Sequence, residues 1–169
     1  MLEMIPVKSE EQISEIKELF REYSTSLGFD LSFQNFQQEL GDLPGEYSPP
    51  EGRLILAVYN GQTAGCAALR KSADGISEMK RLYVRPEFRG LGIGRALAEV
   101  IIEEARIIGY SSMRLDTVSS MEDASRLYRS LGFRETGPYR YNPLENAVFM
   151  EKKLSVPLPD SGGKCKLNN

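Results

Sequence analysis

Histidine is absent from this 169-residue chain, and its absence removes several kinds of chemistry. Neither a Ser-His-Asp triad nor a Cys-His pair can form, and a zinc site with histidine ligands is excluded. Any general acid or base must therefore be Glu, Asp, Tyr, Lys or Cys. The sequence implies no metal.

Cysteine and long apolar runs are also scarce. Cys66 lies in an apolar run and Cys165 in a polar C-terminal tail, so no disulfide framework is indicated. We expect Cys66 to be a small buried residue and not a nucleophile. No stretch approaches the roughly 20 apolar residues of a membrane span, and the charged N-terminus does not look like a signal peptide. These features predict a cytoplasmic protein with no membrane association.

Positive charge is low overall but concentrated in one segment. The formal net charge of −3 argues against a general nucleic-acid-binding protein. Between residues 78 and 95, however, several basic side chains face only Glu78 and Glu87. The basic side chains are Lys80, Arg81, Arg85, Arg89 and Arg95. Such a local patch suits a small anionic ligand better than a polymer.

Hydrophobic periodicity predicts one domain over residues 1–155, with a flexible tail over 156–169. Helices are predicted over residues 10–27, 33–40, about 92–108 and about 121–131. Strands are predicted over residues 53–59, 62–70, 76–84, 112–118, 134–141 and 147–154. Asn60-Gly61 indicates a hairpin turn, and Ser120 with Asp123 resembles a helix-capping pair. The order predicts a mixed α/β sheet flanked by helices, antiparallel at first and parallel around the long central helix.

The most informative segment is the run Arg-Gly-Leu-Gly-Ile-Gly at residues 89–94, between a predicted strand and the long helix. A glycine-rich turn that opens a helix presents backbone N–H groups at the positive end of the helix dipole, which favours phosphate binding. A dinucleotide-binding fingerprint fails, because its last position would be Arg95 or Leu97. A Walker loop fails too, since no Gly-Lys-Ser or Gly-Lys-Thr follows.

The run Arg-x-x-Gly-x-Gly resembles the acyl-CoA signature of the GNAT superfamily of N-acetyltransferases. Residues 80–88 look like the family's preceding strand, and the spacing of Ala124, Leu127, Tyr128, Gly132 and Phe133 looks like its second motif. The resemblance covers about residues 3–155. It implies a strongly twisted mixed central sheet, acetyl-CoA as co-substrate, and coenzyme contacts to both the turn and the strand before it, which pairs with the pantetheine arm like an added strand. The implied coenzyme-binding residues are Leu82, Tyr83, Val84, Arg89, Gly90, Leu91, Gly92, Ile93, Gly94 and Arg95.

The resemblance also implies catalytic residues. Tyr128 matches the family tyrosine that protonates the coenzyme thiolate. A core tyrosine with a wet hydroxyl would look identical in sequence, but the motif match favours the catalytic role. Glu78 is the candidate base, because some family members carry a glutamate there; a solvated charge at the start of a strand would fit as well. Strand alternation predicts that Glu78, Lys80, Leu82 and Val84 share one face, where Lys80 could form a salt bridge with Glu78.

Several positions stay open. Met121 stands where many family members have an asparagine that contacts pantetheine. Arg81 could select an acceptor carboxylate or simply cover the sheet, and Tyr139, Tyr141 and Asn142 lie where the family often contacts its acceptor. Neither cysteine is expected near the thioester, which favours direct transfer in a ternary complex over an acetyl-cysteine intermediate.

The predicted function is transfer of the acetyl group of acetyl-CoA to a primary amine. The sequence leaves the acceptor open among small molecules, protein N-termini and lysine side chains. The resemblance also allows a homodimer. A non-catalytic acyl-CoA-binding regulatory module is the alternative, since its fold and turn would look the same.

Overall fold

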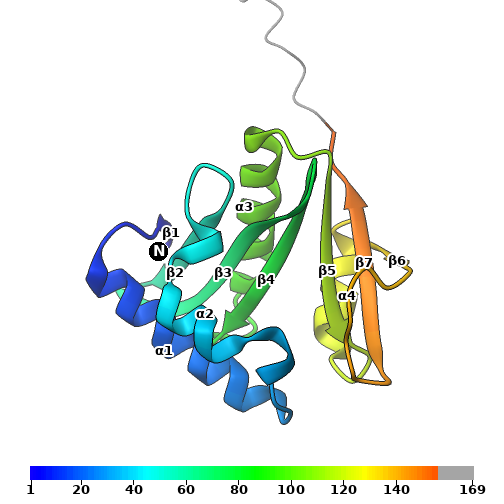
Figure 1. Cartoon of the computed structure of the whole chain (residues 1–169). Coiled ribbons are helices and arrows are strands. Elements are labelled where there is room, and N and C mark those ends of the chain that lie inside the picture. The colour runs from blue at the N-terminus through cyan, green and yellow to red at the C-terminus, as the bar shows by residue number, and fades with distance from the viewer. Residues whose placement is uncertain (156–169) are drawn as a thin grey trace, which may run out of the picture.

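The computed structural model describes residues 1–155, and the predicted tail over 156–169 lies outside the described residues. The strands are β1 (Leu2–Pro6), β2 (Arg53–Tyr59), β3 (Gln62–Ala73), β4 (Ile76–Val84), β5 (Ser112–Val118), β6 (Arg134–Thr136) and β7 (Ala147–Lys153). The helices are α1 (Glu10–Leu27), α2 (Phe36–Asp42), α3 (Ile93–Ile108) and α4 (Glu122–Ser130). Within residues 1–155 the strands form one sheet in the order β1-β2-β3-β4-β5-β7-β6 (Figure 1). This confirms the predicted mixed sheet flanked by helices.

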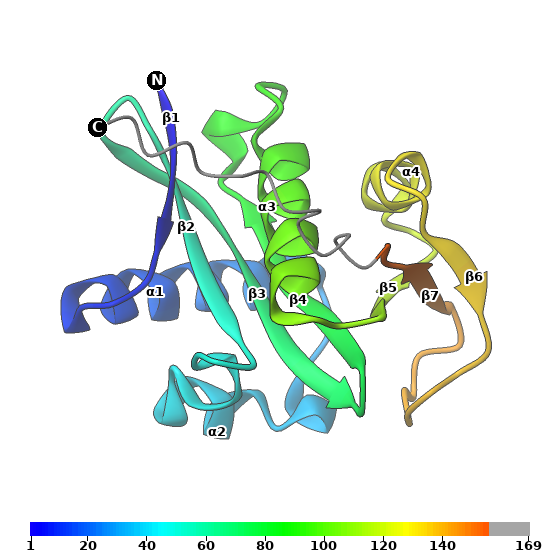
Figure 2. The same cartoon turned by 90° about the horizontal axis from the view of Figure 1, so that it is seen from above.

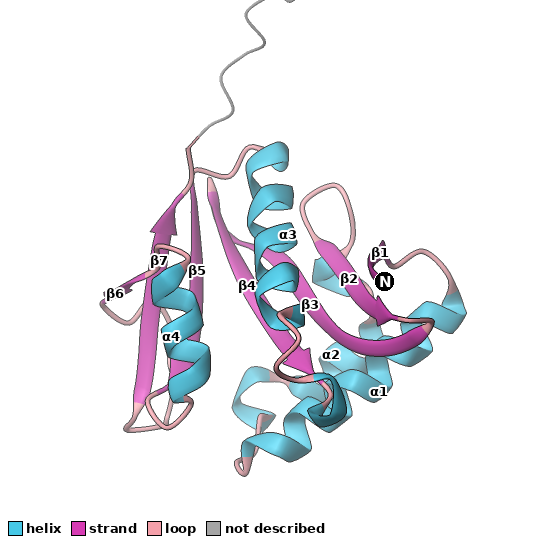
Figure 3. Ribbon diagram, turned by 180° about the vertical axis from the view of Figure 1, so that it is seen from behind, coloured by secondary structure: helices cyan, strands magenta, loops and turns pink. Residues whose placement is uncertain are grey.

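Helices cover both faces of this sheet (Figure 2). On one face lie α1 and α2, and the buried side chains Leu19 and Phe20 of α1 join a core with Leu56 of β2. On the other face lie α3 and α4, as the view from behind shows (Figure 3). There Leu97 and Ile101 of α3 belong to the second core. No helix within residues 1–155 combines the length and apolar character needed to cross a membrane.

Local sequence signals set the ends of several elements. The Ser9 side chain caps α1 by accepting a hydrogen bond from the Gln12 backbone N–H, and the Gln12 side chain bonds back to the Ser9 N–H. At the other end Gly28 has a left-handed φ of 73°, which terminates the helix. Asn60 and Gly61 both have positive φ, as a tight hairpin turn requires. The predicted bounds of α1, β2, β4 and β5 are confirmed.

Other local predictions are wrong. The edge strand β1 was not expected, because only five residues precede its end at Pro6 and the strand depends on pairing with β2. The helix predicted over 33–40 is divided into a 3₁₀ turn, Ser32–Gln34, and α2, because Asn35 has a φ of 56° between them. Helix α4 begins after Met121 with no side-chain cap, so Ser120 and Asp123 do not form a capping pair. The strand predicted over 134–141 is only the three residues of β6.

The two parallel strands at the centre of the sheet separate after a short stretch of pairing. Only Ile76–Glu78 of β4 pairs with β5, at residues 112–114. Beyond this point β5 continues along β7, while β4 continues along β3 (Figure 1). The strands therefore leave an opening between them on the side where β4 ends.

A bulge in β4 lies beside this opening. Tyr83 pairs with Cys66 and Lys80 with Ala68, so Ala67 faces two residues of β4, and Arg81 has a φ of 59°. The bulge breaks the predicted alternation. Lys80 bonds to Gln34, beside α2, whereas Leu82 and Val84 pack against the core under α3. The expectation that these residues share one face is wrong, because alternation holds only where each residue has one partner.

Gly65 allows β3 to approach β4 just past the bulge. A Cβ at Gly65 would overlap the Tyr83 carbonyl oxygen, so Gly65→Ala must force the strands apart. We expect a loss of about 1–3 kcal/mol in the free energy of unfolding, measured by urea denaturation. Gly41→Ala in α2 is the matched control, since its Cβ meets open space and alanine favours the helix. A Gly65→Ala variant as stable as the wild type would contradict this account.

Candidate functional site

The glycine turn ends in a set of free backbone donors. Gly90 and Gly92 have φ values of 82° and 79°, which L side chains rarely adopt. The first bond within α3 runs from the Ala96 N–H to the Gly92 carbonyl, and Gly92 supplies no side-chain cap. The N–H groups of residues 93–95 therefore have no partner within the helix. Together with the helix dipole, they form a site suited to an anion.

A groove of about 730 Å³ runs from this turn past the end of β4 and the start of α4. Most of the coenzyme-binding residues predicted from the sequence line it: Leu82, Tyr83, Val84, Arg89, Gly90, Gly92, Ile93 and Gly94. Leu91 and Arg95 do not. The Leu91 side chain is half exposed, and Arg95 pairs with Glu99 at 3.1 Å.

Arg89 connects the turn to β4 through its side chain. Its Nε donates to the Val84 carbonyl oxygen at 3.0 Å, and its guanidinium lies 5.9 Å from the centre of the Tyr83 ring. The arginine of the motif thus contacts the same strand that forms the groove wall.

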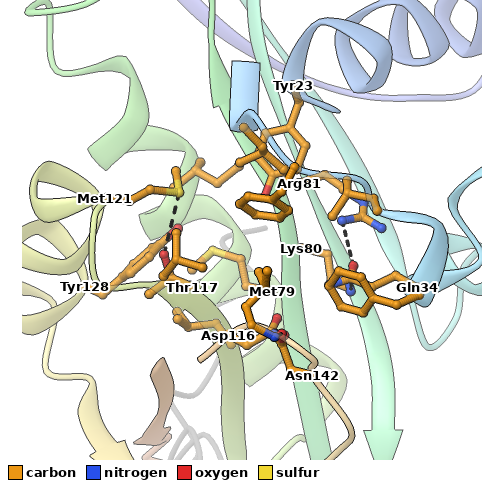
Figure 4. Close-up of a pocket in the computed structure, with 18 residues that line it drawn as sticks. Tyr23, Gln34, Met79, Lys80, Arg81, Asp116, Thr117, Met121, Tyr128 and Asn142 are labelled. Carbon is orange, nitrogen blue, oxygen red and sulfur yellow. Dashed lines mark hydrogen bonds between the residues drawn. The ribbon is translucent and has the colours of Figure 1, made fainter. Parts of the chain in front are cut away.

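A second, narrower cavity of about 50 Å³ lies in the opening between β4 and β5 (Figure 4). It shares wall residues with the groove, so the two cavities adjoin each other. The shared residues are Tyr23, Leu27, Leu82, Val118 and Met121. Polar groups gather at this end from β4, β5, α4 and the segment before β7: Lys80, Arg81, Asp116, Tyr128 and Asn142.

Tyr128 lies on the wall of the narrow cavity. Its ring packs edge-on against Phe133 with centres 5.9 Å apart, and burial raises the pKa of its phenol. Within the described residues its hydroxyl makes no hydrogen bond. A protonated phenol on the wall of such a cavity can act as a proton donor.

Glu78 is placed differently. Its side chain is 1% exposed and does not line either cavity. It accepts hydrogen bonds from Arg70 at 2.8 Å and from the Tyr139 hydroxyl at 2.7 Å, and it pairs with Arg140 at 3.1 Å. Burial alone would raise its pKa, but Lys80, Arg140 and Arg70, with the Tyr139 hydroxyl, bring that pKa below its usual range.

Arg81 covers the sheet and is already paired. It forms a two-pronged bond with Glu39 at 2.9 and 3.0 Å, and its guanidinium lies over the Phe36 ring. Cys66 is fully buried, as expected; its thiol donates to the Arg81 carbonyl at 3.4 Å, and burial raises its pKa. Cys165 lies outside the described residues.

Sequence reasoning missed other wall residues. Asp116 accepts from Arg140 at 2.6 Å and from Asn142 at 3.2 Å. A carboxylate in a central strand, between Leu115 and Thr117, was the signal that could have marked it. Tyr23 and Gln34 gave no such signal, because they reach the site through the packing of α1 and the following turn (Figure 4). Met121 lines both cavities, and its sulfur accepts a hydrogen bond from Thr117.

Comparison with known proteins agrees with this geometry. The model of the acetyltransferase (GNAT) family matches residues 13–133. An uncharacterized N-acetyltransferase of Schizosaccharomyces pombe is 43% identical over 151 residues, covering 88% of this chain and 93% of that protein. N-acetylaspartate synthetase of Danio rerio is 38% identical over 101 residues, covering 59% of this chain and 36% of that one.

A solved structure shows the same fold with the coenzyme present. The PaiA N-acetyltransferase of Thermoplasma acidophilum, in complex with coenzyme A, superposes with a TM-score of 0.71 at 19% identity, over 90% of this chain and 99% of that one. The family match and the extent of the yeast relative together confirm the resemblance found in the sequence. This chain belongs to the GNAT family of acetyl-CoA-dependent N-acetyltransferases.

Proposed function

We propose that the enzyme transfers the acetyl group of acetyl-CoA directly to a primary amine while both substrates are bound. The observation that carries this proposal is that the two cavities adjoin each other, with common wall residues, at the opening between β4 and β5. A coenzyme in the groove and an amine in the narrow cavity would meet beside Tyr128. We also propose that residues 1–155 form a single catalytic domain.

The groove suits an extended coenzyme. The free N–H groups of residues 93–95 would bind the diphosphate, with Gly90 and Gly92 permitting the turn. The edge of β4 over residues 82–84 has left β5, so its backbone can pair with the pantetheine arm as an added strand would. This path leads the thioester from the turn toward the narrow cavity.

The reaction then needs two proton movements. The neutral amine nitrogen attacks the thioester carbon and forms the C–N bond, and the C–S bond breaks as the oxyanion collapses. The carboxylate of Asp116 would take the proton that the amine loses, and Tyr128 would give one to the departing sulfur and regain it from solvent. Because the pKa of Tyr128 is raised, the phenol keeps its proton until the sulfur begins to leave.

Asp116 is the better candidate for the group that binds the acceptor amine and takes its proton, because its carboxylate lines the narrow cavity. The role of Glu78 as the general base stays a prediction. Its contacts favour a supporting role, because Arg70, Tyr139 and Arg140 already bond to it and Arg140 in turn holds Asp116. The thiol of Cys66 is fully buried, which favours direct transfer over an acetyl-cysteine intermediate.

Tyr128→Phe tests the catalytic role. In a thiol-release assay with acetyl-CoA and a panel of amines, including free amino acids, we expect wild-type turnover and about a 10²-fold lower kcat for the variant. Coenzyme affinity, measured by calorimetry, should stay within about twofold. Tyr110→Phe, which loses a hydroxyl bonded to Glu51 away from the site, is the control. Coenzyme binding without thiol release from any amine would support the non-catalytic module instead.

Gly92→Ala tests the turn. Alanine should move φ out of the left-handed region and misdirect the N–H groups at the start of α3, weakening coenzyme A binding about tenfold. Gly28→Ala is the matched control, because Gly28 also has positive φ and a Cβ at either glycine would meet open space. Both variants should lose similar stability, and only Gly92→Ala should lose affinity. Equal affinities for the two would remove the turn from the binding site.

Glu78→Gln separates the two roles of Glu78. Arg70 and Arg140 would each lose one of two carboxylate partners, so we expect a loss of about 1–3 kcal/mol in the free energy of unfolding at pH 7. Since the folded pKa of Glu78 is lowered, its contribution is complete above the unfolded value of about 4.3 and lost as pH falls through the folded value. The gap from wild type should therefore shrink in acid.

Glu99→Gln, at an exposed ion pair with Arg95, is the control and should change stability by less than about 1 kcal/mol. A Glu78→Gln enzyme of wild-type stability whose rate no longer depends on pH would instead identify Glu78 as the base.

A further inference from the structure

Lys80 is a buried amine without a carboxylate partner. Its side chain is 6% exposed on the wall of the narrow cavity. Nζ donates to the Gln34 amide oxygen at 2.9 Å, and within residues 1–155 no carboxylate oxygen lies within 4.0 Å of it. A buried ammonium is costly unless it is paired, so an anion placed beside Lys80 would stabilise its charged form.

The neighbouring arginines, in contrast, each have a carboxylate partner. Arg81 pairs with Glu39 at 2.9 Å, Arg70 with Glu78 at 2.8 Å, and Arg140 with Asp116 at 2.6 Å. The nearby carboxylates are thus already engaged by arginines. A negative group entering the cavity would find Lys80 as its free cationic partner among the described wall residues.

The electrostatic setting agrees with this geometry. Burial, and then the charge of Arg81, brings the pKa of Lys80 down to about 7; Glu78 opposes the change, and Arg140 and Arg70 add to it. An incoming anion would hold the proton on Lys80 and relieve the repulsion from the arginines.

The opposite wall has the opposite charge. Asp116 of β5 lines the same cavity, with Asn142 bonded to it, while Lys80 comes from β4 (Figure 4). The cavity therefore has a carboxylate on one strand, which Arg140 and Asn142 also contact, and an ammonium without a carboxylate partner on the other. Those two groups complement the amine and the carboxylate of one small molecule.

We propose that the acceptor is an α-amino acid whose carboxylate binds the Lys80 ammonium and whose amine lies toward Asp116 and the thioester. This proposal rests on the proposed acetyltransferase function and assigns its substrate class. Lys80 is then the residue that distinguishes amino acids from simple amines.

Matched substrate pairs test the assignment. Alanine is compared with ethylamine, and leucine with 3-methylbutylamine, in the thiol-release assay at pH 7. For the wild type, kcat/KM should be at least tenfold higher for each amino acid than for its decarboxylated partner. Lys80→Met, which keeps the length of the side chain without its charge, should remove this preference through KM. Lys80→Arg, which keeps the charge, should restore part of it.

Lys71→Gln is the control, because Lys71 is a partly exposed lysine paired with Asp74 away from both cavities. It should leave both kinetic constants unchanged. Thermal unfolding of Lys80→Met verifies that the variant is folded, and removal of an unpaired buried charge should not lower its stability.

Binding of the product gives an independent readout, since an N-acetylamino acid has a carboxylate but no titrating amine. Its Kd, measured by calorimetry, should rise about tenfold per pH unit above pH 7 as Lys80 loses its proton, and it should not vary with pH in Lys80→Met. The titratable and charged groups that face Lys80 are Glu78 and Arg81 on β4, Arg70 on β3, Asp116 on β5, Arg140 before β7, Tyr23 on α1 and Tyr128 on α4. The pKa of Glu78 is lowered and those of Arg81, Arg70, Tyr23 and Tyr128 are raised, so these shifts move the five groups away from titration near pH 7.

The possible failures are distinct. Equal use of amines and amino acids, with no change in KM for Lys80→Met, overturns the substrate assignment and leaves the acetyltransferase intact. A fall in kcat for both members of each pair in Lys80→Met would also overturn it, since Lys80 would then act on the amine proton. Thiol release from neither class would reject the proposed function itself.

Discussion

The site depends on the parting of two parallel strands. β4 and β5 share only three paired positions, and each then follows a different neighbour. A strand that leaves its partner exposes unpaired backbone groups, which a folded protein must satisfy in another way. On the side toward the glycine turn, the freed edge of β4 forms the wall of a groove. Between the strands it borders the narrow cavity.

Charged side chains close the paired end of this opening. Glu78, at the last paired position of β4, bonds to Arg70 of β3 and to Arg140 from the segment before β7. Arg140 continues to Asp116 of β5. Ion pairs therefore cross the sheet where main-chain bonding between β4 and β5 stops, and a buried network of this kind fixes relative positions more than it adds stability.

The parts of the fold that follow from local chemistry could be predicted from the sequence. The bounds of α1 and β2 came from periodicity and from stop signals at Gly28 and Asn60, and the glycine turn was found from its spacing. The bulge at Arg81 could not be predicted, because no glycine marks it and it arises from the register of β4 against β3. The partners of Glu78 and the lack of a carboxylate beside Lys80 could not be predicted from the sequence either, because they depend on side chains many residues away.

Helix α1 contributes to more than the core. Tyr23 and Leu27 near its end line both cavities, as do Val118 and Met121 on the opposite side. A ligand in either cavity would therefore contact side chains that also shape the other. By thermodynamic linkage, whatever factor one substrate imposes on the affinity of its companion must be returned in equal measure, and these common walls are where such coupling would arise.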